Sequence, residues 1–340
     1  MANTELHIYD KDLKFQGVAD VFSSLRWRRK YFDAGEFEIH LQATVKNIIL
    51  FRKNNIVVRE GCTEAGLIKS VELVETKQST TLTVKGRFLS HLLYRRIIQS
   101  RINFTGTVTN GMRRLLSEMT PFNSLEVENT TIPSETISFQ CTYRNVYNFI
   151  NRLSLASNIG FRVVADIQNK KLIFQNFVGI NRTRKQKENP FYEFSEEYSN
   201  IEQANYLTDN RTLCNYALVG GEGEGSARVL VIINNTAGLH DFDIVERFVD
   251  AKMITQGELT LAQYRELLRE HGNDFIQEIT KSINYDVYTD DYKTKWDLGD
   301  IVTVKKESWG IEEDLRVTEV EEVIEGNTRR ITPTFRYSIV

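Results

Sequence analysis

The chain contains the stretch Tyr216-Ala-Leu-Val-Gly-Gly-Glu-Gly-Glu-Gly-Ser-Ala-Arg228-Val-Leu-Val-Ile-Ile233, an apolar strand, a glycine-rich loop and a second apolar strand. Four glycines fall within six residues of the loop, and glycine alone reaches positive φ at low cost. A phosphate-binding loop would continue into Gly-Lys-Ser/Thr or directly into a helix, whereas a β-branched strand follows here and two glutamates lie inside the loop. The pattern therefore predicts a β-hairpin whose turn lets backbone or a partner approach closely.

Around this hairpin, residues 190–340 are predicted to form a β domain with a helical insertion near 245–280. Within the insertion, Thr260-Leu-Ala-Gln263 matches a capping box, in which the Thr side chain accepts from the third amide and Gln reaches back. An apolar stripe that includes Tyr264 and Leu268 follows, and Gly272 is the expected end of this helix. Alternating apolar and polar residues predict strands at 193–195, 201–208, 283–289, 300–304, 315–320 and 330–340, with a turn at 325–327.

Residues 1–100 are predicted to form another β domain. The run Phe37-Glu-Ile-His-Leu-Gln-Ala43 alternates with period two, which indicates a strand with one buried and one wet face. Strands at this spacing favour a small barrel or sandwich, and the apolar residues of 88–98 predict a helix at the end of the domain. Further short strands are predicted at 56–58, 67–68, 71–74 and 81–85.

The composition changes after residue 100, and 101–189 are predicted to form an α+β domain. Apolar residues recur at helical spacing over 107–119 and 144–157, with Gly160 as the expected end of the second helix. A hairpin is predicted between 161–165 and 171–174, and the polar, basic residues 181–190 predict a linker. The predicted fold is thus α+β and predominantly β, with domains at 1–100, 101–189 and 190–340.

The composition is that of an ordinary globular protein, with 41% hydrophobic and 26% charged residues and a net charge of −3. The mixture of both signs gives no bias toward nucleic acid or acidic membranes. No apolar run approaches the ~18 residues of a membrane helix, and no signal peptide is visible, so no membrane insertion is expected. Three widely separated cysteines favour synthesis in a reducing cytoplasm over a disulfide framework.

Local motifs for catalysis or metal binding are absent from the sequence. The histidines are too far apart for a zinc motif, and no Gly-x-Ser-x-Gly elbow occurs, so we predict no catalytic residue, no metal site and no cofactor. Acidic pairs such as Glu196-Glu197 and Asp290-Asp291 are interpreted as solvated charges rather than a glycosidase pair, because adjacent strand residues point to opposite faces.

The basic cluster Arg26-Trp-Arg-Arg-Lys30 has two interpretations. An indole among four cations is compatible with the stacking of nucleic-acid bases. The cluster leads directly into Tyr31-Phe-Asp-Ala-Gly35, however, and this favours a strand with one charged face. Given the net charge of −3, we favour a structural role or a protein partner and expect no nucleic-acid partner.

Several segments, taken in order, resemble the Gp37-like tail proteins of siphophages, relatives of the gp27-like baseplate hub. The segments are Trp27–Glu38, Ala65–Ile68, Lys85–Ile98, Phe194–Ile201, the glycine loop with Arg228, and Trp296–Asp300. The resemblance implies a gp27-like hub architecture of two small β-barrel-like domains with α+β insertions. It also implies a homotrimeric ring that joins the tail tube or a distal tail protein to a tail fibre, spike or tip protein.

In such a ring, the resemblance makes two elements candidates for the subunit interface. Glycines would let neighbouring backbones approach, and charged residues would fix the register between subunits. The candidate interface residues are Trp27, Arg28, Arg29, Gly220, Gly221, Gly223, Gly225 and Arg228.

The predicted function is that of a non-enzymatic structural virion protein of a phage or prophage, made in the host bacterial cytoplasm and located in the tail. The alternative is a tail-associated cell-wall hydrolase, a peptidase or glycosidase, which a catalytic constellation in a concave pocket would favour. The third hypothesis is a nucleic-acid-binding module, which steeply salt-dependent binding of DNA would support. Many tail proteins of this kind continue into a hydrolase or receptor-binding region, and because this chain ends at Val340 we expect those activities of a separate protein.

Overall fold

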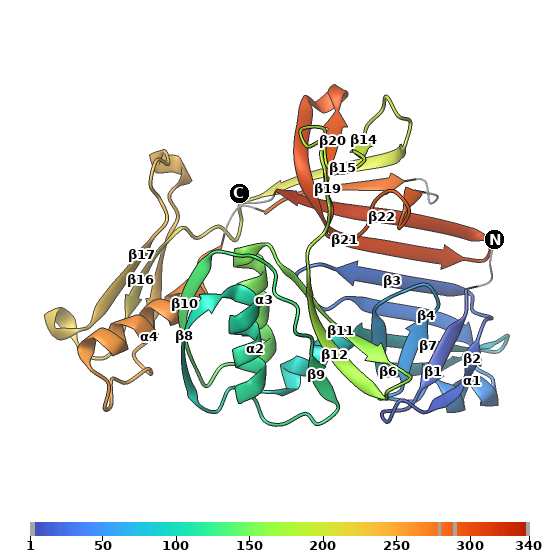
Figure 1. The fold of residues 1–340 in the computed structure, drawn as a ribbon, viewed down its shortest axis with the longest axis horizontal. Coiled ribbons are helices and arrows are strands. Elements are labelled where there is room, and N and C mark those ends of the chain that lie inside the picture. The colour runs from blue at the N-terminus through green and yellow to red at the C-terminus, as the bar shows by residue number, and fades with distance from the viewer. Residues whose placement is uncertain (1–3, 278–279, 288–290, 338–340) are drawn as a thin grey trace. The chain divides into compact units, whose positions relative to one another are not determined.

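The computed structural model describes residues 4–277, 280–287 and 291–337 (Figure 1). The chain divides into two compact units, the first made of residues 1–205 and 283–340 and the second of residues 206–282. The second unit contains the glycine-rich hairpin and the capped helix. The three domains expected from the sequence stay a prediction, since this division follows a different boundary.

The first unit begins with strands, as expected for residues 1–100. The predicted helix at 88–98 is wrong in type, because β7 runs to Phe88 and a 3-10 helix, η1 (Leu89–Arg95), follows. The strands and the short helix before it are β1 (Leu6–Tyr9), β2 (Phe15–Ala19), β3 (Ser24–Lys30), β4 (Glu36–Gln42), α1 (Val45–Leu50), β5 (Ile56–Arg59), β6 (Ala65–Glu75) and β7 (Thr80–Phe88).

The middle of the first unit contains both helices predicted there. The Asn145 side chain caps α3 by accepting from the Asn148 amide, and Asn158, at φ 57°, ends it two residues before the expected Gly160. The predicted hairpin is confirmed by the antiparallel pairing of β11 with β12. The elements are β8 (Arg101–Thr107), α2 (Val108–Glu118), β9 (Leu125–Val127), β10 (Thr136–Thr142), α3 (Val146–Ser157), β11 (Gly160–Asp166) and β12 (Lys171–Phe177).

The last part of the first unit is again β. The linker expected at 181–190 is wrong at its start, because Asn181 and Arg182 form β13 and pair in parallel with β20. Strand residues predicted at 288–289 and 338–340 lie outside the described residues. The strands that lie in or extend into this part are β13 (Asn181–Arg182), β14 (Glu193–Phe194), β15 (Ile201–Asp209), β19 (Thr280–Val287), β20 (Ile301–Lys306), β21 (Ile311–Glu325) and β22 (Thr328–Tyr337).

One sheet joins the two ends of the chain. Its order includes β22-β21-β3-β4-β7-β6-β5-β1-β2, and Figure 1 shows the red β21 beside the blue β3. The two strands pair antiparallel from Glu319 opposite Lys30 to Glu325 opposite Ser24. The predominantly β fold is therefore confirmed, but the described strands form no closed barrel, and the two barrel-like domains stay a prediction.

Buried side chains in the first unit gather into three clusters. One lies within the N-terminal strands around Trp27 and Ile39, a second around the helices α2 and α3, and a third around Phe194 and Phe335 in the C-terminal strands. Each cluster removes large apolar side chains from water, which is the main stabilising term for such a fold. The shared sheet thus links cores that are separate in sequence.

The second unit is a three-stranded sheet covered on one face by a helix. Strand β16 (Tyr216–Gly220) pairs antiparallel with β17 (Leu230–Asn234) and in parallel with β18 (Glu246–Asp250), and this confirms the predicted hairpin. The helix α4 (Leu261–Asn273) has the predicted capping box at Thr260. The helix ends at Asn273, one residue after the expected Gly272. A Cβ on Gly272 would come within 2.4 Å of Val219, so glycine at this position allows the close approach of α4 to the sheet.

Candidate functional site

The basic cluster predicted as a candidate interface is strand β3, and its side chains alternate between two environments. Leu25, Trp27 and Arg29 are buried, whereas Arg26 and Arg28 on the other face are partly exposed. Trp27 is 1% exposed and packs against Phe37 and Phe88, with ring centroids 5.5 and 4.8 Å apart. The indole is therefore part of the core of its own chain.

Arg29 holds a buried network of charges. Its Nε and Nη2 donate to the two carboxylate oxygens of Glu64 at 2.7 and 2.9 Å, and Nη1 donates to Tyr292 at 2.9 Å and Asp297 at 2.5 Å. Burial opposes the charge on Arg29, but Glu64, Tyr292 and Asp297 raise its pKa well above the ordinary value. Burial also disfavours the charged form of Glu64, which by itself would raise the pKa of this carboxyl. The nearby Arg29 has the larger effect, and the pKa of Glu64 is lowered.

The exposed face of the same sheet carries cations and carboxylates in alternation across four strands. Arg28 donates from Nε to Glu321 on β21 at 2.6 Å and from Nη1 to Glu36 on β4 at 3.3 Å. Glu36 in turn accepts from Arg87 on β7 at 3.2 Å. Opposite charges on directly paired strands stabilise one register, and a slip would set like charges against each other.

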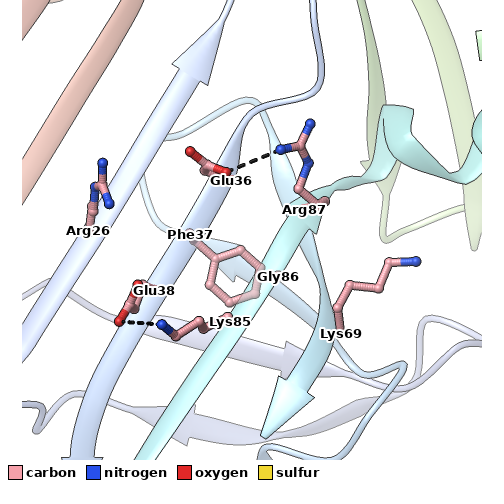
Figure 2. Close-up of a pocket in the computed structure, with 8 residues that line it drawn as sticks. All are labelled: Arg26, Glu36, Phe37, Glu38, Lys69, Lys85, Gly86 and Arg87. Carbon is pink, nitrogen blue, oxygen red and sulfur yellow. Dashed lines mark hydrogen bonds and ion pairs between the residues drawn. The ribbon is translucent and has the colours of Figure 1, made fainter. Parts of the chain in front are cut away.

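A shallow pocket of about 250 Å³ lies beside this charged row (Figure 2). Figure 2 shows the Arg87 guanidinium turned toward Glu36 and the Lys85 amine turned toward Glu38. The lining residues are Arg26, Glu36, Phe37, Glu38, Lys69, Lys85, Gly86 and Arg87.

The chemistry of this pocket is that of paired charges. Burial acts to raise the pKa of Glu38, but bonds from Lys85 and His40 lower it below the ordinary value. A general acid needs a raised pKa, so Glu38 is not suited to protonate a leaving group. Among the described residues, Lys69 is the one cation lining the pocket that forms no ion pair.

Lys69 owes its position to an irregularity in β6. The register between β6 and β7 shifts between Ile68 and Ser70, so Lys69 is the extra residue of a β-bulge. Bulges re-aim side chains and end regular pairing. Lys69 thus lines the pocket together with three other cations, Arg26, Lys85 and Arg87, and Figure 2 shows its amine turned away from Lys85.

The glycine loop in the second unit is closed by its own arginine. Arg228 donates from Nε to the Gly221 carbonyl at 3.0 Å and from Nη2 to the Gly220 carbonyl at 2.9 Å, and it also pairs with Asp250. Its guanidinium lies 5.3 Å from the Phe248 ring centroid, within the range of a cation–π contact. Arg228 therefore ties the loop to both β16 and β18.

The glycines of the loop have distinct roles. A Cβ on Gly221 would meet the Tyr264 hydroxyl at 2.5 Å, and one on Gly220 would meet the Arg228 side chain at 2.8 Å. Gly223 and Gly225 have φ of 101° and 54°, which other residues rarely adopt. Close approach thus occurs within the chain, between the loop, α4 and Arg228.

The two predicted groups of interface residues belong to different units: Trp27, Arg28 and Arg29 to the first, Gly220 to Arg228 to the second. Their role as a subunit interface stays a prediction. The sequence analysis missed the acidic partners Glu36, Glu64 and Glu321. The alternation of 36–42 signalled that Glu36 and Glu38 share a face, but no sequence signal connects Glu321 with Arg28.

In the part of the chain that the structure describes, no three histidine, cysteine or acidic side chains gather as a metal site would require. No described helix is long and apolar enough to cross a membrane.

The fold of the chain is similar to the folds of solved tail proteins. The structure is similar to the tail protein from Neisseria meningitidis MC58, with 12% identity, 99% of this chain and 97% of that chain covered, and a TM-score of 0.58. It is also similar to the 43 kDa tail protein of prophage MuSo2 from Shewanella oneidensis, with 12% identity, coverage of 97% and 98%, and a TM-score of 0.56. A third similar structure is prophage tail protein gp18 from Listeria monocytogenes EGD-e, with 14% identity, 97% of this chain and 94% of that chain covered, and a TM-score of 0.52.

At these identities the likeness shows a shared fold, and membership is decided by the family comparison. Residues 5–335 match the model of the Siphovirus ReqiPepy6 Gp37-like protein family. The molecule is a phage tail protein by class. The chain belongs to the Siphovirus ReqiPepy6 Gp37-like protein family, and this confirms the resemblance seen in its sequence.

Membership in this family gives the chain a structural role in the virion tail. No curated protein is similar enough in sequence to match it.

Proposed function

We propose that the protein is a gp27-like tail hub, in which three copies form a closed ring between the tail tube and the distal tip or fibre. The main support is the number of large apolar side chains left exposed in both units. In the first unit Val21 is 78% exposed and Tyr143 77%, and in the second Phe242 is 93% exposed and Met253 94%. Single exposed apolar side chains are ordinary, but contiguous groups of them mark surfaces that other proteins cover.

The charged row on β3, β4, β7 and β21 supports the same function. Its ion pairs join strands from both ends of the chain, so the surface they form is fixed in shape rather than flexible. A closed ring needs protomers of fixed shape, because a heterologous contact closes only at one rotation between neighbours. In this ring the tail tube or a distal tail protein contacts one face, and a fibre, spike or tip protein contacts the other.

Light scattering across a concentration series tests this proposal. The chain has a mass of 39.4 kDa, and a stable species of three times that mass is expected. A monomer at every concentration, in the presence and absence of neighbouring tail proteins, would contradict the ring. An assay of peptidoglycan release by the purified protein is the accompanying control, and no release above a heat-inactivated sample is expected.

A further inference from the structure

The sheet of the second unit has one covered and one open face. Ala217, Val219 and Val249 face α4 and are buried with Tyr264 and Leu268. The opposite face is also apolar, and among the described residues Arg228 contacts it, with its guanidinium 5.3 Å from the Phe248 ring centroid.

On the open face, three side chains stand in one row across the three strands. Leu218 lies directly opposite Ile232 on β17 and Phe248 on β18. Ile232 is 54% exposed and Phe248 53%, and Leu230 beside them is 48% exposed. A row of aromatic and branched side chains on paired strands forms a continuous apolar surface. We call Leu218, Leu230, Ile232 and Phe248 the open sheet face.

The surroundings of the open sheet face are acidic. Glu246 and Asp250 lie two residues on either side of Phe248 and therefore point to the same face, where Asp250 is paired with Arg228 and Glu246 forms no ion pair with a described residue. Just before β18, the 3-10 helix η3 (Asp241–Asp243) presents Phe242 between two aspartates. Residues 206–282 carry 12 acidic and 7 basic residues. An occupant of this face must therefore be apolar at its centre and basic around it.

The first unit carries a surface of that complementary kind. Tyr94 and Ile97 are each 51% exposed, and Tyr143 is 77% exposed. The three lie around one junction, since Asn145 donates to the Tyr94 carbonyl at 2.7 Å and its backbone is bridged to Ile97. Tyr143 has φ of 53°, a conformation that costs energy for an aromatic residue and is found at functional sites.

Cations extend this surface. Arg95 follows Tyr94 and approaches the Asn54 side chain at 3.5 Å, next to Lys53. Burial lowers the pKa of Lys69, and repulsion from Arg95 and Lys53 lowers it further. Among the described residues, no ion pair neutralises Lys53, Lys69 or Arg95. We call Lys53, Lys69, Tyr94, Arg95, Ile97 and Tyr143 the basic aromatic patch.

We propose that the open sheet face of one copy docks on the basic aromatic patch of a second copy. The two surfaces complement each other in charge, and tyrosine and arginine are enriched where protein interfaces gain most of their affinity. Because the two surfaces differ, the contact is heterologous and repeats from copy to copy until the ring closes. The inference rests on the proposed ring and assigns residues to its contact.

Charge-reversing and polar substitutions test the two surfaces separately. The face variant carries the uncharged polar changes Ile232→Ser and Phe248→Ser, and the patch variant carries the charge reversals Lys69→Glu and Arg95→Glu. A control carries Val45→Asp, which alters a valine that is 75% exposed and lies outside both surfaces. Light scattering of each is compared with the unaltered chain, and thermal unfolding confirms that each variant folds. We expect the control to keep the trimer mass and both variants to be monomers.

Mixing the two variants gives the decisive result. The face variant keeps an intact patch and the patch variant an intact face, so one productive contact remains and a dimer of about twice 39.4 kDa is expected. If both variants stay trimeric while folded, another occupant covers the open sheet face and this inference is overturned, while the ring stands. If the unaltered chain is monomeric throughout, the ring and this contact are both overturned.

Discussion

Arg29 and Glu64 form a two-pronged ion pair, in which Nε and Nη2 of the arginine donate to separate carboxylate oxygens at 2.7 and 2.9 Å. Both residues are buried, at 4% and 5% exposure. Arg29 lies on β3 and reaches Asp297, just before β20, with its remaining nitrogen. Arg29 therefore joins the N-terminal strands to the segment before β20, at a buried position where a charge without its partner would be costly.

Replacing Glu64 by Leu leaves the Arg29 guanidinium buried without its main acceptor. We expect the free energy of unfolding to fall by about 3 kcal/mol, the lower end of the range for breaking a buried pair, because Asp297 still faces Nη1. Denaturant unfolding measures the change. Glu126→Gln, which removes the exposed partner of Lys171, is the control and should leave stability within error. Equal effects of the two substitutions would contradict a special role for the buried pair.

The stability of the protein should fall in acid. The arginines beside Glu64 and Glu321 outweigh burial and hold the pKa of each carboxyl below its ordinary value. A carboxyl in the unfolded chain titrates near pH 4.3, so this stabilisation is present above about pH 4.3 and is lost as the pH falls through the lower folded pKa values. Thermal unfolding midpoints measured from pH 7 to pH 3 should show the loss. Glu64→Leu should reduce the slope, and an unchanged slope would assign the acid sensitivity to other carboxyls.

Two glycines of the loop should respond differently to alanine. At Gly221 the new Cβ would meet the Tyr264 hydroxyl at 2.5 Å and Leu268 at 2.6 Å, so we expect a loss of about 3 kcal/mol through overpacking. At Gly225 there is nothing within 4 Å, and only the φ of 54° opposes the change, at about 1 kcal/mol. Denaturant unfolding of the two variants ranks the costs. The reverse order would mean that α4 moves aside easily.

Local patterns predicted much of the secondary structure. The alternation of residues 37–43 gives β4, the helical spacing gives α2 and α3, and the capping box at Thr260 gives the start of α4. These elements depend on neighbours within a few residues, which a single sequence displays. The 3-10 helix after Phe88 could not be distinguished from an α-helix, because its apolar residues have similar spacing over one or two turns.

Long-range pairing could not be predicted in the same way. Arg28 and Glu321 are 293 residues apart, and β21 has many acidic residues with which β3 could align. The alternation along β3 places Trp27 and Arg29 on one face and Arg28 on the other. Which of the two faces is buried depends on how β4, β21 and the loop before β20 pack against the strand. In the glycine loop, the density of glycine predicted a close approach. The approaching groups, Tyr264 and Arg228, are set by packing within the second unit.

The Tyr264 hydroxyl is expected to hold the glycine loop in place. It accepts from the Glu222 amide at 2.6 Å and donates to the Ile254 carbonyl at 2.5 Å, so Tyr264→Phe leaves two backbone groups without their partner. We expect a loss of about 1–3 kcal/mol and faster hydrogen exchange at the Glu222 amide, measured by mass spectrometry.

Tyr285→Phe is the matched control, because the Tyr285 hydroxyl is buried with no hydrogen-bond partner among the described residues. Its removal should be neutral or stabilising, since no bond is lost and a buried polar group disappears. If Tyr264→Phe leaves both stability and exchange at Glu222 unchanged, Arg228 alone closes the loop. In that case Arg228→Lys, which keeps the charge but loses the planar fork to Gly220 and Gly221, should release it.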